Sequence, residues 1–407
     1  MCTHALPDDI PELILVRLDS TACLIRASST CKRWRRVVAG VGFLRRFRSI
    51  HGPPIVAGTY DDGARFTPTP SSGIDGRHFS LDFLPGNTRS SSSFAWVFKD
   101  TRAGLVLLER NDRGAAGPYK QDLVICDPLS RRYEIIAPFY RATWFPHNKA
   151  FLLDGDSSKS SSMAMADGGC IGLSNFRVIC VAFTVGPGGG GYEAFVFTSG
   201  SSCGWRTIHI HGQSNFRCFS LMGHSEGKIY WWVDGGMAVV VNRATADLAS
   251  FVLRDGVEGF GDGSYEATVT TGRNGEARIA VRRIYRGNDY VKVFAARQQE
   301  LAARGIEWAL EKTIRLPAAA TPGGQWHDGC WSFSKAQTLA AASCRRKGTV
   351  FIRLPAEGLL LALDLDSETI EPESALSKVG YPVELPWPPV LRACRQPGTD
   401  LGDHHER

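Results

Sequence analysis

The first fifty residues carry apolar side chains at the spacing of amphipathic helices. One set recurs at helical intervals, which places its members along a single stripe of one helix. The members of this stripe are Ile10, Leu13, Ile14 and Leu18. A second short helix is expected through Leu24, and a third over 31–39, which Gly40 ends. The pattern therefore predicts a small head of three helices over residues 1–50.

From residue 51 onward the helical period is lost, and short apolar runs alternate with clusters of Gly, Pro, Asn, Asp and Ser. Runs of this kind are typical of strands separated by turns. The expected strands are 104–108, 122–126, 133–137, 176–185, 192–198, 228–233, 238–241, 277–284, 290–295, 349–354 and 359–363. The pattern predicts a large all-β domain over 51–390, followed by a polar tail over 391–407.

A loosely repeated unit within this region joins two strands through a polar turn. Its closer copies are LVICDPLSRRYEIIAP (123–138), AVVVNRATADLASFVL (238–253) and LLLALDLDSETIEP (359–372), with longer variants at 192–210 and 291–317. In the closer copies an Asp or Asn begins the turn and a Ser or Thr follows, which favours side chains that bond the local backbone. Copies recur at about 40 to 70 residues, near the length of a propeller blade. We favour an irregular β-propeller of roughly six to eight blades, with a pair of β-sandwiches as the alternative.

The charge of the chain is concentrated in its head. The 407 residues have a formal net charge of +6, and the first fifty hold nine basic and four acidic side chains. The remaining residues are close to neutral, which argues against a nucleic acid as the target of the β domain. The basic segment 31–48 has the composition to contact phosphate groups, so nucleic-acid binding through the head stays as an alternative.

Three motifs resemble sites of chemistry, and each has a simpler interpretation. The segment 200–204 matches GxSxG, which would make Ser202 a nucleophile if a helix followed, but the alternating residues that follow favour a hairpin. His209 and His211 share a strand face, yet no third metal ligand lies near them in sequence. The glycine-rich segment 186–191 lacks the lysine of a P-loop and is expected to be a flexible hairpin end. We therefore expect no catalytic residue, no metal and no cofactor.

Cysteine use and hydropathy indicate an intracellular protein of the cytoplasm or nucleus. The eleven cysteines are scattered and form no CxxC pair, which favours reduced thiols. No apolar run approaches the length needed to cross a bilayer, and the first residues lack the basic region of a secretory signal. We expect no membrane partner.

Two groups of segments resemble one protein family. LPDDIPELILVRL (6–18), LIRASSTCKRWRRVV (24–38) and Phe43 resemble the F-box motif. Downstream pieces resemble the associated β domain of plant F-box proteins; they are GLVLLE (104–109), CDPLSRRYEIIAP (126–138), GKIYWWVDGG (227–236) and EWALEKTIRLP (307–317). The first helical turn departs from the common F-box pattern at Pro11 and Leu13.

The resemblance implies a non-catalytic subunit of a ubiquitin ligase. F-box proteins of this kind are substrate receptors of cullin-based ligases. The F-box would dock on the acidic S-phase-kinase-associated adaptor protein, and through it on a cullin, while the β domain would hold a substrate protein of unknown identity. The residues implied as adaptor contacts are Leu6, Pro7, Ile10, Leu13, Ile14, Leu15, Leu18, Leu24, Lys32 and Arg35.

Overall fold

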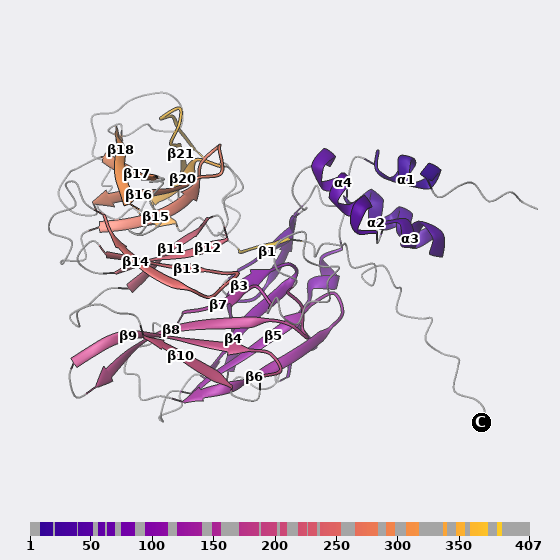
Figure 1. The fold of residues 1–407 in the computed structure, drawn as a ribbon, viewed down its shortest axis with the longest axis horizontal. Coiled ribbons are helices and arrows are strands. Elements are labelled where there is room, and N and C mark those ends of the chain that lie inside the picture. Colours follow the sequence, from indigo (N-terminus) through magenta and orange to yellow (C-terminus); the bar gives the residue numbers. More distant parts are fainter. Residues whose placement is uncertain are drawn as a thin grey trace, which may run out of the picture. The chain divides into compact units, whose positions relative to one another are not determined.

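The computed structural model shows a chain that divides into two compact units (Figure 1). The first unit holds Met1–Tyr140, Ile171–Ser174 and Gly380–Arg407, and the second holds Arg141–Cys170 and Asn175–Val379. The structure describes residues 9–18, 21–38, 40–51, 56–61, 63–69, 75–85, 94–112, 120–140, 149–155, 171–186, 189–201, 204–209, 219–225, 227–233, 237–253, 265–283, 290–297, 307–316, 337–339, 347–354, 359–372 and 381–384.

The head contains one helix more than the sequence pattern predicted. Its helices are α1 (Asp9–Leu15), α2 (Thr21–Thr30), α3 (Lys32–Val38) and α4 (Val41–His51). The helix α3 does end at Gly40, whose N–H donates to the carbonyl of Val37, but α4 begins at once. Phe43 and Phe47 lie four residues apart, so they share one face of α4, and both are buried in the helical core. The expected count of three helices was therefore wrong.

A small core holds the four helices together. Its buried members are Leu15, Val16, Leu24, Val38, Phe43 and Phe47. Trp34 of α3 is partly buried against this cluster and so helps to join the helices. At the far end of α4, Nε2 of His51 donates a hydrogen bond to the carbonyl oxygen of Val16 at 2.7 Å. The end of α4 is thus tied to the end of α1.

Two sheets complete the described part of the first unit. One has the strand order β2-β1-β23, and the other has the order β3-β4-β5-β6. Their strands are β1 (Val56–Tyr60), β2 (Phe66–Pro68), β23 (Tyr381–Glu384), β3 (Phe94–Arg102), β4 (Leu105–Asp112), β5 (Lys120–Asp127) and β6 (Arg132–Tyr140), with a 3-10 helix η2 (Gly76–Phe79) between β2 and β3. Because β1 pairs antiparallel with β23, the two ends of the β region are joined within one sheet.

The second unit contains four further antiparallel sheets among its described residues. The first has β7 (Lys149–Leu153), β8 (Arg177–Gly186), β9 (Gly189–Thr198) and β10 (Trp205–His209), and the next has β11 (Phe219–Ser225), β12 (Lys228–Val233), β13 (Met237–Asn242) and β14 (Leu248–Val252). The third has β15 (Tyr265–Thr271), β16 (Ala277–Arg283), β17 (Tyr290–Arg297) and β18 (Glu307–Arg315), and the last has β19 (Gln337–Leu339), β20 (Thr349–Leu354), β21 (Leu359–Asp364) and β22 (Ile370–Pro372). In each sheet, strands that follow one another in sequence are neighbours.

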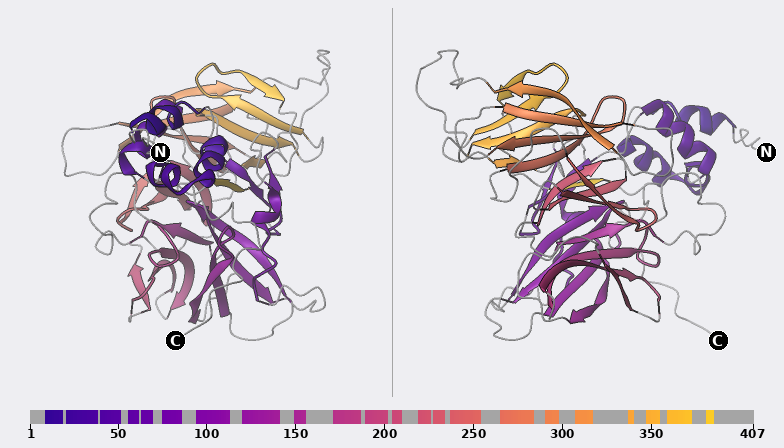
Figure 2. Two further views of the ribbon diagram at one scale, coloured as in Figure 1. Left: turned by 90° about the vertical axis from the view of Figure 1, so that its right-hand side faces the viewer. Right: turned by 60° about the vertical axis from the view of Figure 1, so that its left-hand side comes forward.

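The sheet that contains β12 in the second unit is buried on both faces. Figures 1 and 2 show the orange and yellow sheets of the same unit stacked next to one another. Tyr230 and Trp232 of β12 enter a cluster shared with β16 and β17, while Trp231 enters a cluster shared with β8 and β9. Ala280 of β16 likewise faces Ile352 of β20. A sheet of a sandwich buries one face, whereas a propeller blade packs against the blade before it and the blade after it.

The fold class is therefore a few N-terminal helices followed by a large all-β domain arranged as a six-bladed β-propeller. All eleven of the expected apolar runs coincide with strands to within a residue at their ends, and most of their apolar residues are buried. The glycine-rich segment 186–191 differs from expectation in one respect. Gly186 pairs with Gly189 at the end of β8 and β9, so most of the segment belongs to a paired hairpin.

The turns of the repeated unit have the geometry that their sequences predict. In each closer copy, the first side chain accepts hydrogen bonds from the backbone N–H groups two and three residues later. The donors are Leu129 and Ser130 for Asp127, Ala244 and Thr245 for Asn242, and Asp366 and Ser367 for Asp364. The residue four positions after the first Asp or Asn of each turn has a positive φ, and these residues are Arg131, Ala246 and Glu368. The three copies are thus one turn type, placed between the third and fourth strand of three different blades.

We expect Ala103→Asn to stabilise the chain. Ala103 and Gly104 are the central residues of the two-residue turn between β3 and β4, with φ of 48° and 83°. An alanine in this region costs about 1 kcal/mol, and Asn-Gly is the preferred pair for such a turn. The free energy of unfolding should rise by about 0.5 kcal/mol, measured from urea midpoints. Gly104→Ala should act in the opposite direction, and equal midpoints for the two variants would contradict the assignment of the turn.

Candidate functional site

The helix α1 presents apolar side chains on two sides. Pro11, Leu15 and Val16 are buried against the other helices. The remaining apolar residues of α1 point away from this core, and they are Ile10, Leu13 and Ile14, with 39%, 47% and 52% of their surface exposed. These three residues, here called the α1 patch, lie at i, i+3 and i+4 and so share one face of the helix. The head is too small to bury these three side chains in its own core.

The structure separates the expected adaptor contacts into surface and core residues. Leu15 and Leu24 are fully buried within the helical core, so in this structure they support the patch from below and offer no surface to a partner. Leu18 is partly buried against the same core. The apolar residues of α1 spread over more than one face of the helix. Some of them are buried in the helical core, and the others form the exposed α1 patch. Leu6 and Pro7 lie outside the described residues.

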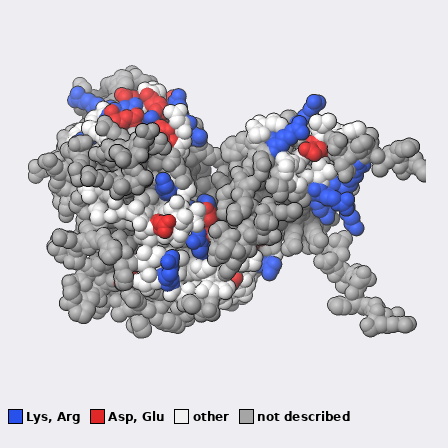
Figure 3. All heavy atoms as spheres, viewed as in Figure 1, with Lys and Arg blue, Asp and Glu red and all other residues white. Residues whose placement is uncertain are grey.

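The helix next to α1 in the head carries exposed basic side chains. Lys32, Arg35 and Arg36 are exposed on α3, which packs against α1. Figure 3 shows Lys and Arg side chains gathered over the helices with few acidic ones among them. One acidic side chain on α1, Glu12, pairs with Arg46 of α4 at 3.7 Å. The head therefore carries an exposed apolar strip on α1 and exposed basic side chains, here called the basic border, on the neighbouring helix α3. This combination suits a partner with apolar and acidic surface.

Two exposed residues of the head were not among the expected contacts. Arg36 lies next to Arg35 on the exposed side of α3. Ile50 is 56% exposed on α4. The sequence contained a signal for Arg36 in the basic run of α3, but none for Ile50, because α4 itself was not expected.

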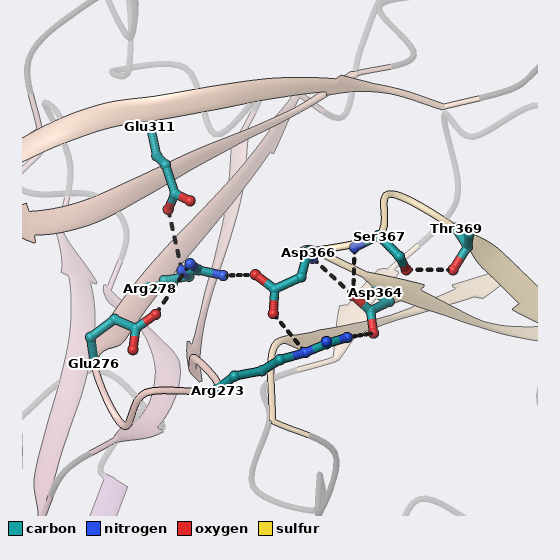
Figure 4. Close-up of polar contacts among 8 residues, drawn as sticks. All are labelled: Arg273, Glu276, Arg278, Glu311, Asp364, Asp366, Ser367 and Thr369. Atoms are coloured by element: carbon teal, nitrogen blue, oxygen red, sulfur yellow. Dashed lines mark hydrogen bonds and ion pairs between the residues drawn. The ribbon is translucent and has the colours of Figure 1, made fainter.

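A cluster of charged side chains lies in the second unit, where two blades meet (Figure 4). Arg278 of β16 forms ion pairs with Glu276, Glu311 and Asp366. Arg273 bridges Asp366 at 3.0 Å and Asp364 at 3.2 Å. Since β16 and β18 belong to one sheet and the Asp364 turn to the next, the cluster joins neighbouring blades. Its carboxylates are occupied by arginines, so the cluster has the chemistry of a structural clamp.

The turn carboxylate of this cluster is held in its charged form. Burial by itself raises the pKa of Asp364, but hydrogen bonds from the N–H groups of Ser367 and Asp366 and from Arg273 outweigh it, and the pKa lies below its ordinary value. Because the folded-state pKa is lowered, the turn contributes stability at neutral pH that is lost as pH falls through that pKa. The expectation that carboxylates such as Asp364 serve turns is confirmed here.

The described residues contain no arrangement typical of a catalytic or metal site. Gly204 is followed by the strand β10, so a nucleophile elbow, which needs a helix at that point, is not formed. No group of His, Cys, Asp and Glu in the described part of the chain is arranged to hold a metal ion. Ser202 and His211 lie outside the described residues, as does the side chain of His209. Within the same residues, no helix is both long and apolar enough to cross a membrane.

The thiols of two strand cysteines are shielded from solvent. Cys126 and Cys180 are fully buried reduced thiols. Burial raises the pKa of the Cys126 thiol far above its ordinary value, which keeps it protonated and unreactive at neutral pH. This agrees with the expected reduced thiols for these two residues.

The helical head can now be compared with known families. Residues 3–49 match the F-box-like family model. The chain therefore carries an F-box-like domain, and the α1 patch and its basic border lie within the matched residues. No similar sequence was found among curated proteins.

Comparison with solved structures returns β-rich proteins at low similarity. The nidogen/laminin complex shares 8% identity at a TM-score of 0.34, over 68% of this chain and 79% of the other. The WD40 domain of SCAP from fission yeast shares 8% at 0.30, over 70% and 62%. AztD from Citrobacter koseri shares 10% at 0.31, over 72% and 81%. Scores this low carry no weight for the fold, which rests on the sheets themselves.

Proposed function

We propose that this protein is a substrate receptor of a cullin-based ubiquitin ligase. Its F-box-like head, residues 1–50, docks on the S-phase-kinase-associated adaptor protein, which links it to a cullin. Its β domain, residues 51–390, holds a target protein. The protein is a non-catalytic scaffold, which raises the local concentration of the target near the ligase's ubiquitin carrier.

The observation that carries this proposal is the α1 patch within the F-box-like match. Three large apolar side chains are exposed side by side on one short helix, in a domain too small to bury them. An exposed apolar face of this kind marks a protein interface. The border of Lys32 and Arg35 fits an acidic adaptor, and charges at an interface border act mainly on the rate of association.

We expect Lys32→Ala with Arg35→Ala to slow adaptor association by about tenfold at low salt, with a smaller change in the dissociation rate. Both side chains are exposed, so the fold should be unaffected. The measurement is biolayer interferometry of the full chain against purified adaptor, repeated at rising salt. A rate that is unchanged at every salt concentration would contradict the role of the basic border.

Nucleic-acid binding by the segment 31–48 is the second candidate, favoured by the exposed basic face of α3. Biolayer interferometry also distinguishes nucleic-acid binding from adaptor binding. A phosphate-binding head would bind duplex DNA with an affinity that falls steeply as salt rises, and Leu13 and Ile14 would not matter to it. Adaptor binding depends on the apolar patch and survives at higher salt.

A further inference from the structure

One edge strand of the first unit differs from the other described strands in what it exposes. Among described strand residues, the large apolar side chains open to solvent are Tyr133, Ile135 and Val252, at 42%, 62% and 52% exposure. Two of these lie on β6. This strand is the last of its sheet and pairs on one side only, with β5, so its other edge is free among the described strands.

The two faces of β6 offer different chemistry. Successive side chains of a strand point to opposite faces, so Tyr133 and Ile135 share one face, and Arg132 and Glu134 share the other. On the apolar face, Tyr133 contacts Phe83 with ring centroids 6.4 Å apart, and Arg131 lies over Phe83 at 5.1 Å. This contact leaves an apolar shelf formed by Phe83, Tyr133 and Ile135.

A pocket of about 530 Å³ borders the same strand within the first unit. Leu105 and Ala103 supply apolar lining, and the segment Ile171–Ser174 forms one wall. Its charged lining residues are Asp127, Arg132 and Glu134, which gives the pocket one net negative charge. The volume lies in the range of pockets that hold small ligands or side chains.

The Glu134 carboxylate is the partly buried acidic group of this pocket that has no partner among the described residues, whereas Arg132, also without a partner among them, is exposed. Asp127 is occupied by its turn, where Ser130 Oγ donates to it at 2.6 Å. Glu134 forms no side-chain hydrogen bond or ion pair with any described residue, and burial raises the pKa of its carboxyl above the ordinary value. A half-buried carboxylate without a counter-ion is stabilised by a cation that enters the pocket.

We propose that the free edge of β6 binds an extended segment of a partner protein in which basic and apolar side chains alternate. The segment adds a strand to the sheet, its lysine or arginine side chains enter the pocket toward Glu134, and its apolar side chains lie on the Phe83–Tyr133–Ile135 shelf. Backbone pairing supplies affinity, and the two faces supply selectivity. The proposal rests on the proposed function, since it names the kind of segment that the substrate receptor holds.

The test is binding of a labelled nine-residue peptide that alternates lysine with valine or threonine, measured by fluorescence anisotropy with the full chain. Glu134→Gln should weaken binding about tenfold. Glu134→Lys should transfer the preference to the same peptide with glutamate in place of lysine. The matched control is Glu371→Gln on β22, another outer strand with an exposed glutamate, which should leave binding unchanged.

A second peptide, N-methylated at alternate amides, distinguishes strand addition from plain charge attraction. It keeps every charge but cannot pair along one edge, so it should bind at least about tenfold more weakly. Equal binding of the methylated peptide, equal binding of the acidic peptide, or no effect of Glu134→Gln would each overturn the proposal. Adaptor binding is measured on the same variants and should not change. Failure of the peptide to bind would therefore contradict the β6 proposal alone, and failure of the adaptor to bind would contradict the proposed function alone.

Discussion

Replacing Leu13 and Ile14 together with aspartate should abolish adaptor binding. Both side chains are about half exposed on α1, and neither belongs to the buried core of the head. Apolar residues at the centre of an interface each contribute about 2 kcal/mol or more, and an aspartate in their place would bury an unpaired charge. The affinity should therefore fall by at least about a hundredfold, measured by titration of purified adaptor into the full chain.

The controls separate loss of the surface from loss of the fold. Val252→Asp is the matched substitution, since Val252 and Ile14 are both 52% exposed, and it should leave adaptor affinity unchanged. Leu15→Ala should instead unfold the head, because Leu15 is fully buried, at a cost of about 3 kcal/mol. Circular dichroism of the double variant should match that of the natural chain. Undiminished adaptor binding by the folded double variant would remove the proposed function.

The helix α1 illustrates which features can be predicted from the sequence alone and which cannot. The period of its apolar residues predicts the helix and the stripe, because spacing is a property of the sequence. It does not say which half of a wide stripe faces the core, since Leu15 and Ile14 are equally apolar. That choice depends on where Leu24, Phe43 and Phe47 lie, which is a matter of tertiary packing.

In the β domain, local features could be predicted from the sequence, whereas contacts between distant segments could not. Apolar runs such as that of β12 predict strands, and the Asp or Asn turns predict where one strand returns to the next, because both are local. The pairing of β1 with β23 joins distant parts of the chain and leaves no local signal. The free carboxylate of Glu134 was likewise invisible, since the sequence does not show that the next wall of its pocket comes from Ile171–Ser174.

The ion cluster around Arg278 also brings together residues that are distant in sequence. Substitution of Arg278 should have the largest effect on stability. Arg278 has 12% of its side chain exposed and pairs with Glu276, Glu311 and Asp366. Arg278→Met keeps the length of the side chain but leaves Asp366 with Arg273 alone, and it removes the ion pairs that Glu276 and Glu311 form with Arg278. Removing one partner from a largely buried ion cluster costs about 3 kcal/mol, so the second unit should unfold at a clearly lower urea concentration at pH 7.

The pH dependence of this loss identifies its cause. At neutral pH the charged carboxylates attract Arg278 in the natural chain and repel one another in the variant, and both effects weaken as the carboxylates take up protons. The lowered pKa of Asp364 depends on its turn and on Arg273, so the stability that it contributes declines with falling pH in both chains alike. The two unfolding free energies should therefore converge between about pH 7 and pH 4.

The comparison is made with Arg315→Met, measured by tryptophan fluorescence across the same pH series. Arg315 is an exposed arginine of β18 with no ion pair to a described residue, so its loss should cost less than about 0.5 kcal/mol at every pH. Equal losses for Arg278→Met and Arg315→Met would mean that the ion cluster adds little to stability. A larger loss at Arg278 that stays constant with pH would mean that the packing of the side chain, and not its charge, holds the two blades together.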